Sequence, residues 1–444
     1  MSMITVQLGQ CGNQVGGQLF STISNDIDGK QHMVTSKENK EYGDQVVQRF
    51  FNRVDGRDMI EARAVMVDME SKVIAKTCLE AKKGGKWKYP DKQQYCQKRG
   101  SGNNWAHGYC VHAPNVKDTV MEMVQKEAEK CDRLSGFLSL LSLAGGTGSG
   151  VGTFINESLR DEFPHSFIMN QVVWPYNTGE VIVQNYNAVL TLSHLYQTAD
   201  AIVVMENDHL HKICSRLLDI KKISFKAINQ VICHKLSSLF LPASSSDGNI
   251  SQNDLGMILH HLVAHPEYKL LTIRNIPQMS DRSIEFSSFH WPGLLKHLRQ
   301  MLVADAAMEE GIDWQVNAGD ETPRGSVRHN RSLANMLVLR GKDVISTDTS
   351  SYLDPKLYTS WTDPELGFSK LIQPRAFNNY EKCAALISNS RSPIRPLNHI
   401  IEKAWNMFAA RAYVHQYTQH GLNEEDFIDG FVTLEQVLAS YKKL

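Results

Sequence analysis

The segment from Ser142 to Gly150, Ser-Leu-Ala-Gly-Gly-Thr-Gly-Ser-Gly, constrains the fold more than any other part of this sequence. It overlaps the end of an apolar run at 137–143, which has the length of a buried strand, and directly precedes a helix-like segment at 151–159. Strand, glycine-rich turn and helix in this order indicate an α/β sheet. Glycines let the backbone approach a ligand closely, and the free amides at a helix start attract negative charge. The sequence therefore predicts a phosphate-binding loop.

Three alternatives to this interpretation can be weighed from the residues alone. The dinucleotide pattern requires an acidic residue at the end of a strand about twenty residues further on, and none is found there. The Walker pattern requires Lys and then Ser or Thr after its last glycine, but Val151 and Gly152 follow. A plain turn or linker is disfavoured by the apolar strand in front of the loop. The loop residues expected to contact the ligand are Ser142, Ala144, Gly145, Gly146, Thr147, Gly148, Ser149 and Gly150.

Gly-Gly-Thr-Gly-Ser-Gly at 145–150 resembles the signature loop of the tubulin and FtsZ family. The turn Gly-Gln-Cys-Gly-Asn-Gln at 9–14 resembles the first nucleotide loop of tubulins, and Gly-Ser-Gly-Asn-Asn-Trp at 100–105 resembles their third. The similarity covers nearly the whole chain. Within the family it is strongest to one branch, through the stretches at 174–180, 274–277, 295–300, 357–361 and 403–408.

The resemblance implies a tubulin/FtsZ-like α/β fold in four parts. These are a parallel-sheet GTP-binding domain (1–222), a central linking helix (223–241), a second, smaller α/β intermediate domain (242–376) and a C-terminal helical region (377–444). Apolar runs of strand length predict strands at 3–8, 62–67, 137–143, 169–173, 201–205, 269–273 and 336–339. Helical periodicity or helix-start signals predict helices after Gly9, at 119–131, 223–241, 292–308 and 397–413, and after Asn423. Loops are expected at 21–60, 242–253 and 317–330.

The resemblance also implies a guanine nucleotide, GTP or GDP, and residues that bind it. Asn207 and Asn229 match the base-reading pair of the family, and an amide can bond both the acceptor and the donor groups of guanine. A single Asn at a helix end is more often a cap, which remains the alternative. Phe225 would stack on the base, and Glu180 would lie by the ribose. The remaining expected contacts are Gly9, Gln10, Cys11, Gln14, Ser101, Gly102 and Asn103.

Two carboxylates follow the predicted strand at 62–67. Asp68 and Glu70 would lie at the edge where open α/β sheets bind ligands, and such acids can hold the waters of a phosphate-bound Mg²⁺. The family likeness puts Glu70 first as the magnesium residue. A solvated turn is the alternative.

Composition narrows the possible partners. Lys plus Arg number 47 and Asp plus Glu number 48, so the chain has no large net charge that would favour binding to nucleic acid or a membrane surface. The eight cysteines do not have the spacing of zinc ligands, so we expect reduced thiols. No apolar run reaches eighteen residues, so we expect no membrane-spanning helix. Residues 82–99 are locally basic and aromatic, and a solvated loop or protein contact is favoured over nucleic-acid binding.

By resemblance, the chain would be a GTP-binding subunit of the cytoplasmic cytoskeleton at the centriole, basal body and cilium, where triplet microtubules form. Its partners would be epsilon-tubulin, further alpha- and beta-tubulin, and centriolar accessory proteins.

Met257 stands where alpha-tubulin has a catalytic Glu, with Asp254 about one helical turn earlier, so poor activation of a neighbour's GTP is expected. Alpha- and beta-tubulins carry a long acidic tail where this sequence ends in Lys-Lys-Leu, so partners that recognise such tails by charge are not expected to bind this subunit in that way. The alternatives are an ordinary polymerising tubulin GTPase and a nucleotide-dependent enzyme such as a dehydrogenase.

Overall fold

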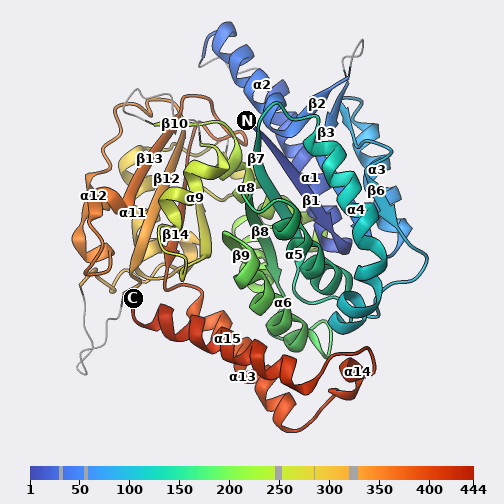
Figure 1. The fold of residues 1–444 in the computed structure, drawn as a ribbon. Helices are drawn as coiled ribbons and strands as arrows, with labels where there is room; N and C mark the ends of the chain where they lie inside the picture. The colour runs from blue at the N-terminus through green and yellow to red at the C-terminus, as the bar shows by residue number, and fades with distance from the viewer. Residues whose placement is uncertain (30–33, 55–58, 246–252, 285, 320–328) are drawn as a thin grey trace. The chain divides into compact units, whose positions relative to one another are not determined.

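The computed structural model describes residues 1–29, 34–54, 59–245, 253–284, 286–319 and 329–444. These residues form two compact units, each built from separate stretches of the chain (Figure 1). Unit 1 comprises Met1–Ser24, Val47–Asp208 and Ile394–Ser440. Unit 2 comprises Asn25–Val46, His209–Pro393 and Tyr441–Leu444. Each unit is described by itself below.

Unit 1 is organised around a parallel sheet with the strand order β9-β8-β7-β1-β4-β6. All the pairings between neighbours in this order are parallel. The strands are nearly continuous apolar runs because both faces of such a sheet are covered. Their bounds are β1 Ser2–Leu8, β4 Ala64–Asp68, β6 Gln94–Cys96, β7 Leu134–Ser142, β8 Phe167–Trp174 and β9 Ala201–Glu206. A small separate sheet contains β2 Phe51–Arg53, β3 Ile60–Ala62 and β5 Trp87–Lys88.

Helices connect these strands and cover the sheet. Helices α4, α5 and α6 lie side by side on one face, with α5 in contact with both of the others (Figure 1). The helices that connect the strands are α1 Gly9–Asp28, α3 Ser71–Lys83, α4 Ala113–Ala128, α5 Gly152–Glu162, α6 Gln184–Thr198 and α7 Asn207–Lys212. Two π-helical turns, η1 His107–His112 and η2 Thr147–Val151, precede α4 and α5.

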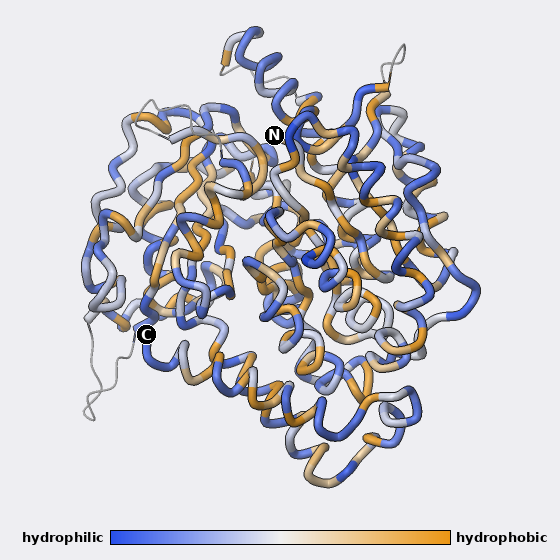
Figure 2. Tube along the Cα trace, in the orientation of Figure 1, coloured by the Kyte–Doolittle hydropathy of each residue, from blue (hydrophilic) through white to orange (hydrophobic). Residues whose placement is uncertain are grey.

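The C-terminal helices of unit 1 pack against α6. They are α13 Ile394–Ala409, α14 His415–Thr418 and α15 Glu424–Lys442, and Figure 2 shows hydrophobic and hydrophilic residues alternating along them. Tyr186 on α6 contacts the rings of Tyr417 and Phe427, with centroids 5.6 and 5.1 Å apart. Its hydroxyl donates to the carbonyl of Ala412 at 2.9 Å. These aromatic contacts attach the C-terminal segment to the helices that flank the sheet.

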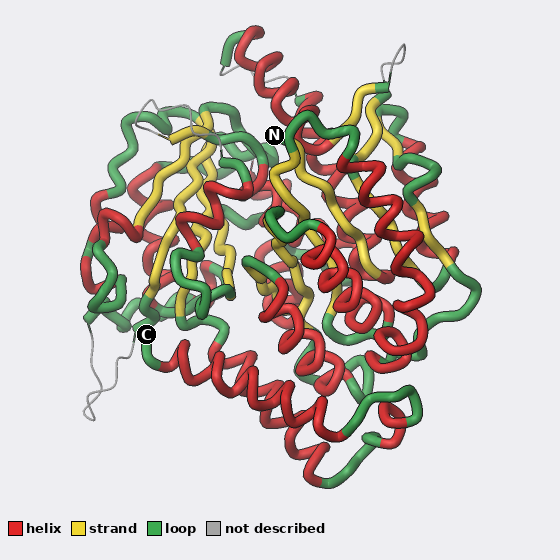
Figure 3. Tube along the Cα trace, in the orientation of Figure 1, coloured by secondary structure: helices red, strands yellow, loops and turns green. Residues whose placement is uncertain are grey.

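Unit 2 contains a mixed sheet with the order β10-β13-β12-β14-β11, in which only the β12–β13 pairing is parallel (Figure 3). Leu295, Leu298 and Leu302 of α11 pack against Leu337 and Leu386 of the sheet to form its core. The strands are β10 Ser244–Ser245, β11 Leu270–Ile276, β12 Ser332–Gly341, β13 Phe368–Gln373 and β14 Lys382–Ser390. The helices are α8 Phe225–Phe240, α9 Leu255–Leu262, α10 Asp281–Ile284, α11 Trp291–Val303 and α12 Pro364–Gly367.

The α/β fold class is confirmed, and strands or helices are found at each predicted strand and helix. The four-part domain division stays a prediction. Most of the predicted loops at 242–253 and 317–330 lies outside the described residues, which omit 246–252 and 320–328.

The expectation of loops at 21–60 is wrong. Helix α1 continues to Asp28, and α2 occupies Ser36–Phe50. Tyr42, Val46 and Phe50, spaced four apart, are buried on one face of α2. A capping box starts this helix, because the Thr35 amide donates to the Glu38 carboxylate at 2.7 Å and the Glu38 amide donates to the Thr35 hydroxyl at 3.2 Å.

Candidate functional site

The order of the strands in unit 1 defines a ligand position. Strand β1 lies between β7 and β4, so the chain proceeds from β1 toward one side of the sheet and later, through β7, β8 and β9, toward the other. Ligands of parallel α/β sheets bind outside the carboxyl ends of the strands at such a reversal. The turn after Leu8 and the loop that begins at Ser142 leave the sheet at this point.

These two turns meet backbone to backbone. Gly9 has φ of +69°, and a Cβ added to it would lie 2.7 Å from the amide nitrogen of Gly148. Glycine is required at position 9 both by the left-handed conformation and by the close approach. The predicted first nucleotide loop and the central glycine loop therefore form one surface.

The loop at 100–105 joins the same surface. The Ser101 and Thr147 hydroxyls are 3.1 Å apart. A Cβ on Gly146 would lie 2.7 Å from the amide nitrogen of Asn104, so these backbones are also in contact. Gly102 and Asn103 form the tip of the turn, with φ of +59° and +54°. Three loops far apart in the sequence thus converge at one edge of the sheet.

Asn187 of α6, which the sequence analysis did not identify, connects two of these loops. Its amide nitrogen donates to the carbonyls of Asn103 and Ala144, each at 2.8 Å. Its side-chain oxygen accepts the amide of Trp105 at 3.0 Å. The side chain is fully buried. Since Asn187 lies inside a helix and its partners are some 40 and 80 residues away, no local pattern could have revealed this role.

Glu70 lies beside the loop at 100–105, and Asp68 bonds the Glu70 amide. Burial raises the pKa of Asp68 to about 6. Its Oδ1 accepts the Glu70 amide at 3.4 Å, and its buried Oδ2 has no hydrogen-bond partner among the described residues. A Cβ on Gly100 would lie 2.6 Å from Oε1 of Glu70, so that carboxylate rests against the loop. An unpaired buried oxygen beside an exposed carboxylate fits an ion held largely through water, as Mg²⁺ is. The described residues contain no set of three His, Cys, Asp or Glu side chains placed to hold a metal.

The other predicted contacts in unit 1 lie on neighbouring elements. Gln10 is exposed and Gln14 is half-buried on α1, and the buried Asn207 begins α7 directly after β9. Burial raises the pKa of the Cys11 thiol to about 12, and the charge of Glu180 adds to this effect. The Cys11 thiol is therefore neutral at physiological pH and poorly suited to act as a nucleophile.

Phe225 and Asn229 belong to unit 2. Phe225 is the first residue of α8 and is 54% exposed, and Asn229 is buried one turn further on. Ser224 is the N-cap of this helix, and its side chain accepts the amide of Ala227 at 3.4 Å. The alternative in which Asn229 serves as the helix cap is therefore wrong.

The segment around Met257 carries an acid that already has a structural role. Asp254 is the N-cap of α9, and its carboxylate accepts the amide of Met257 at 2.8 Å. Such a bond stabilises the start of the helix by about 1 kcal/mol. Met257 itself is half-buried in the first turn of α9.

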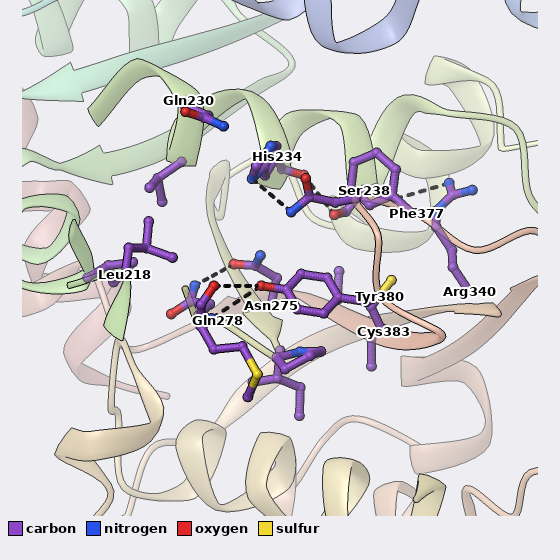
Figure 4. A pocket seen from close by; sticks show the side chains of 18 of the residues that line it. Leu218, Gln230, His234, Ser238, Asn275, Gln278, Arg340, Phe377, Tyr380 and Cys383 are labelled. Carbon is purple, nitrogen blue, oxygen red and sulfur yellow. Dashed lines mark hydrogen bonds between the residues drawn. The ribbon is translucent and has the colours of Figure 1, made fainter. Parts of the chain in front are cut away.

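A cavity of about 190 Å³ lies within unit 2 and contains none of the predicted nucleotide residues (Figure 4). His234 of α8 and Asn378 contact each other across 3.2 Å on its wall. The Gln278 amide donates to Asn275 at 2.8 Å, and the Tyr380 hydroxyl lies 3.2 Å from the Met279 carbonyl. The sequence analysis missed this cavity because its walls come from five separate stretches of chain.

Comparisons with known proteins give one family match and several relatives of full length. Residues 2–215 match the family model described as Tubulin/FtsZ family, GTPase domain. The chain is 51% identical over 454 residues to the tubulin delta chain of Macaca fascicularis and 50% identical to that of Homo sapiens, with 100% of each chain covered. It is 28% identical to the tubulin beta chain of Cicer arietinum, covering 99% of this chain and 94% of the relative. None of the described helices has the length and apolar character needed to cross a membrane.

Proposed function

The chain belongs to the tubulin family, and from that premise we propose that this GTP-binding cytoskeletal subunit acts as a delta-type tubulin in centrioles and basal bodies. The observation that carries the nucleotide part of the proposal is the meeting of three glycine-bearing loops where the strand order reverses. Gly9 approaches Gly148, and Ser101 approaches Thr147, at the carboxyl ends of β1 and β7. Amides, hydroxyls and a π-helical turn leading into α5 together suit a chain of phosphates.

The proposed roles follow the positions of the residues. The loop at 142–150 with Gly9, Gln10, Cys11 and Gln14 cradles the inner phosphates, and the loop of Ser101, Gly102 and Asn103 holds the terminal phosphate. Asp68 and Glu70 hold the waters of Mg²⁺, which neutralises phosphate charge when it is bound. Glu180 accepts from the ribose. Asn207 and Asn229 read the guanine edge, and Phe225 stacks on the base.

The proposed setting is the triplet microtubule of centrioles and basal bodies, and hence the assembly of cilia. The proposed partners are epsilon-tubulin, alpha- and beta-tubulin, and centriolar accessory proteins. The identity of 50–51% over complete chains to delta chains, against 28% to a beta chain, supports this branch of the family over an ordinary lattice tubulin.

Extraction of the nucleotide from the purified protein tests the ligand. Chromatography should identify GTP or GDP, and recovery of an adenine dinucleotide would contradict the assignment. Asn207→Ala should lower the guanine content of the purified protein, because a buried amide that bonds the base is lost. Asn115→Ala, which removes an exposed amide on α4, is the matched control.

Depletion from ciliated cells tests the setting. The expected result is centrioles with doublets or singlets in place of triplets, restored by the parent chain. Normal triplets after complete depletion would contradict the proposal.

A further inference from the structure

One charged surface of unit 1 has no part in the nucleotide site. Between Ser71 and Arg99 the sequence carries nine Lys and Arg residues and two Asp and Glu residues, although the whole chain has a net charge of −1. The segment comprises α3, the turn after it, β5 and the edge strand β6. The segment therefore has a net charge of +7, and the rest of the chain has a net charge of −8.

Helix α3 arranges part of this charge in a row. Lys72, Lys76, Leu79 and Lys83 are spaced by four, three and four residues, which places them on one face of the helix. All four are exposed, and Leu79 is 56% exposed between the lysines. At 1.5 Å per residue the row is roughly 16 Å long. We call it the lysine row.

Among the described residues, no ion pair neutralises a member of the lysine row, and the exposed Glu80 lies next to the row on α3 without pairing with it. The ion pairs that the described residues form in this segment are Lys82 with Asp91 at 3.5 Å and Lys88 with Glu61 at 2.8 Å. Neither involves a member of the row. Three ammonium groups therefore face solvent along one helix face, with one aliphatic side chain between them.

Two of the three aromatic residues in the segment are not available to a ligand, and the third, Tyr95, is half-buried. Trp87 and Tyr89 are 3% and 1% exposed. Both pack on Phe20 of α1, with ring centroids 5.5 and 5.9 Å away, and the Tyr89 hydroxyl contacts Gln7 at 3.0 Å. Single-stranded nucleic acids bind through bases stacked on exposed rings. The pattern of lysines and aromatics that suggested nucleic acid in the sequence is split by the fold into a basic surface and a buried cluster.

The remaining features favour a short acidic peptide over a long polyanion. The basic residues of the segment are eight lysines and one arginine, so the surface offers point charges and little of the bidentate fork with which arginine binds carboxylates and phosphates. An extended peptide advances about 3.3 Å per residue, so side chains two residues apart match the roughly 6 Å between Lys72 and Lys76. Side chains three residues apart match the roughly 10 Å between Lys76 and Lys83. A long polyanion would also meet the acidic remainder of the protein, which a short segment avoids.

From these observations we propose that the lysine row is a docking surface for a short, extended, glutamate-rich segment of a partner protein. Carboxylates of that segment pair with Lys72, Lys76 and Lys83. An apolar side chain of the segment contacts Leu79. Five or so residues of the partner span the row, so the interaction is weak, fast and dependent on salt.

Fluorescence anisotropy with two synthetic peptides tests the proposal on the full chain. The first peptide has twelve residues, all Glu except a central Leu, and in the second Gln replaces every Glu. The parent protein should bind the first and not the second, and the affinity should fall at least tenfold as salt rises from about 0.05 to about 0.3 M. Equal binding of the two peptides would overturn the proposal.

A charge reversal locates the binding. Lys76→Glu/Lys83→Glu should weaken binding of the Glu peptide at least tenfold, because two of the three row charges are inverted. Lys442→Glu/Lys443→Glu makes the same change in net charge on exposed lysines elsewhere. It should change the affinity for the Glu peptide less than twofold. An equal loss in both variants would show a net-charge effect and overturn the assignment. Unchanged nucleotide content and thermal melting separate these effects from misfolding and from the nucleotide site.

Two further arms test the partner class and the apolar contact. Leu79→Ser should weaken binding of the peptide with the central Leu severalfold and leave binding of an all-Glu peptide unchanged. Equal effects on the two peptides would show that Leu79 is not part of the site. Oligothymidylate of equal charge should compete less well than the Glu peptide. Stronger competition by the oligonucleotide would overturn the proposal in favour of nucleic acid.

Discussion

The Tyr417 hydroxyl donates a hydrogen bond to the side-chain oxygen of Asn187 at 2.6 Å. Both groups are buried, and Asn187 also bonds Asn103, Trp105 and Ala144. The C-terminal segment of unit 1 is thereby linked through one amide to the loops proposed to hold the nucleotide. A buried network of this kind is stable only while each polar group keeps its partner.

We expect Asn187→Ala to accelerate release of bound guanine nucleotide at least tenfold, because two loop carbonyls and one amide lose their partner together. Tyr417→Phe removes a single hydroxyl, which bonds Asn187 and lies 3.4 Å from the Val183 carbonyl, and should cost about 1 kcal/mol of stability, with a smaller effect on release. Stopped-flow release of a fluorescent GTP analogue measures both. Equal release rates in the two variants would show that Asn187 does not order the loops.

Gly9→Ala should abolish nucleotide retention. The new methyl group meets the amide of Gly148, and the left-handed conformation adds about 1–2 kcal/mol of strain. Gly85→Ala is the matched control, since Gly85 has the same φ of +69° but open space around its Cβ position. It should show the strain alone, as a modest fall in melting temperature with full nucleotide content. Comparable nucleotide loss in both variants would contradict the close approach of the two loops.

Lys235 makes unit 2 sensitive to pH. Burial, aided by the charge of Arg274, lowers the pKa of Lys235 from 10.5 to about 7, and its ammonium group donates to the Ile273 carbonyl at 2.9 Å. Since the folded state binds this proton less tightly than the unfolded state, the free energy of unfolding should rise as pH increases from about 7 toward 10.5. The rise is lost again as pH falls toward 7.

Lys235→Met isolates this contribution. The variant should be more stable than the parent near pH 7. Removal of the buried amine should stabilise it by an amount on the order of a few kcal/mol, and the lost bond to Ile273 should offset about 1 kcal/mol of this gain. The difference should shrink at pH 9 to 10. Denaturant unfolding at several pH values measures it, and parallel stability curves for the two proteins would refute the assignment.

Met257→Glu should increase GTP turnover in a mixed assembly in which this subunit contacts the nucleotide of a neighbour, because a carboxylate can orient water and a thioether cannot. Asp254→Ala should cost about 1 kcal/mol by removing the cap of α9 and leave turnover unchanged. Phosphate release from the assembled and unassembled proteins separates the two effects. No gain with Met257→Glu would argue against the alignment of this helix with the catalytic segment of alpha-tubulin.

The sequence predicted those helices, strands and turns whose structure depends mainly on their own residues. The strands of unit 1 are apolar runs ended by turn residues, and glycine loops follow β1 and β7, so both could be identified from local pattern. Helix α2 was missed because it contains only three buried apolar residues among polar neighbours. The capping box of Thr35 and Glu38 was the available signal.

Features that depend on distant contacts could not be predicted from local pattern. The bonds of Asn187 reach loops some 40 and 80 residues away, and the burial of Trp87 and Tyr89 depends on Phe20 of α1. In the sequence these rings look like part of the basic stretch. Only the packing separates the lysines from the aromatic side chains.

The three-segment construction of unit 1 has a consequence for biosynthesis. Gly9, Asn103 and Ala144 leave the ribosome long before Tyr417, which supplies the hydroxyl that completes the Asn187 network. During translation the growing chain therefore presents the hydrophobic face of α6 without the aromatic residues that later cover it. Exposed apolar surface of this kind favours aggregation, and it stays exposed until the last part of the chain has been synthesised.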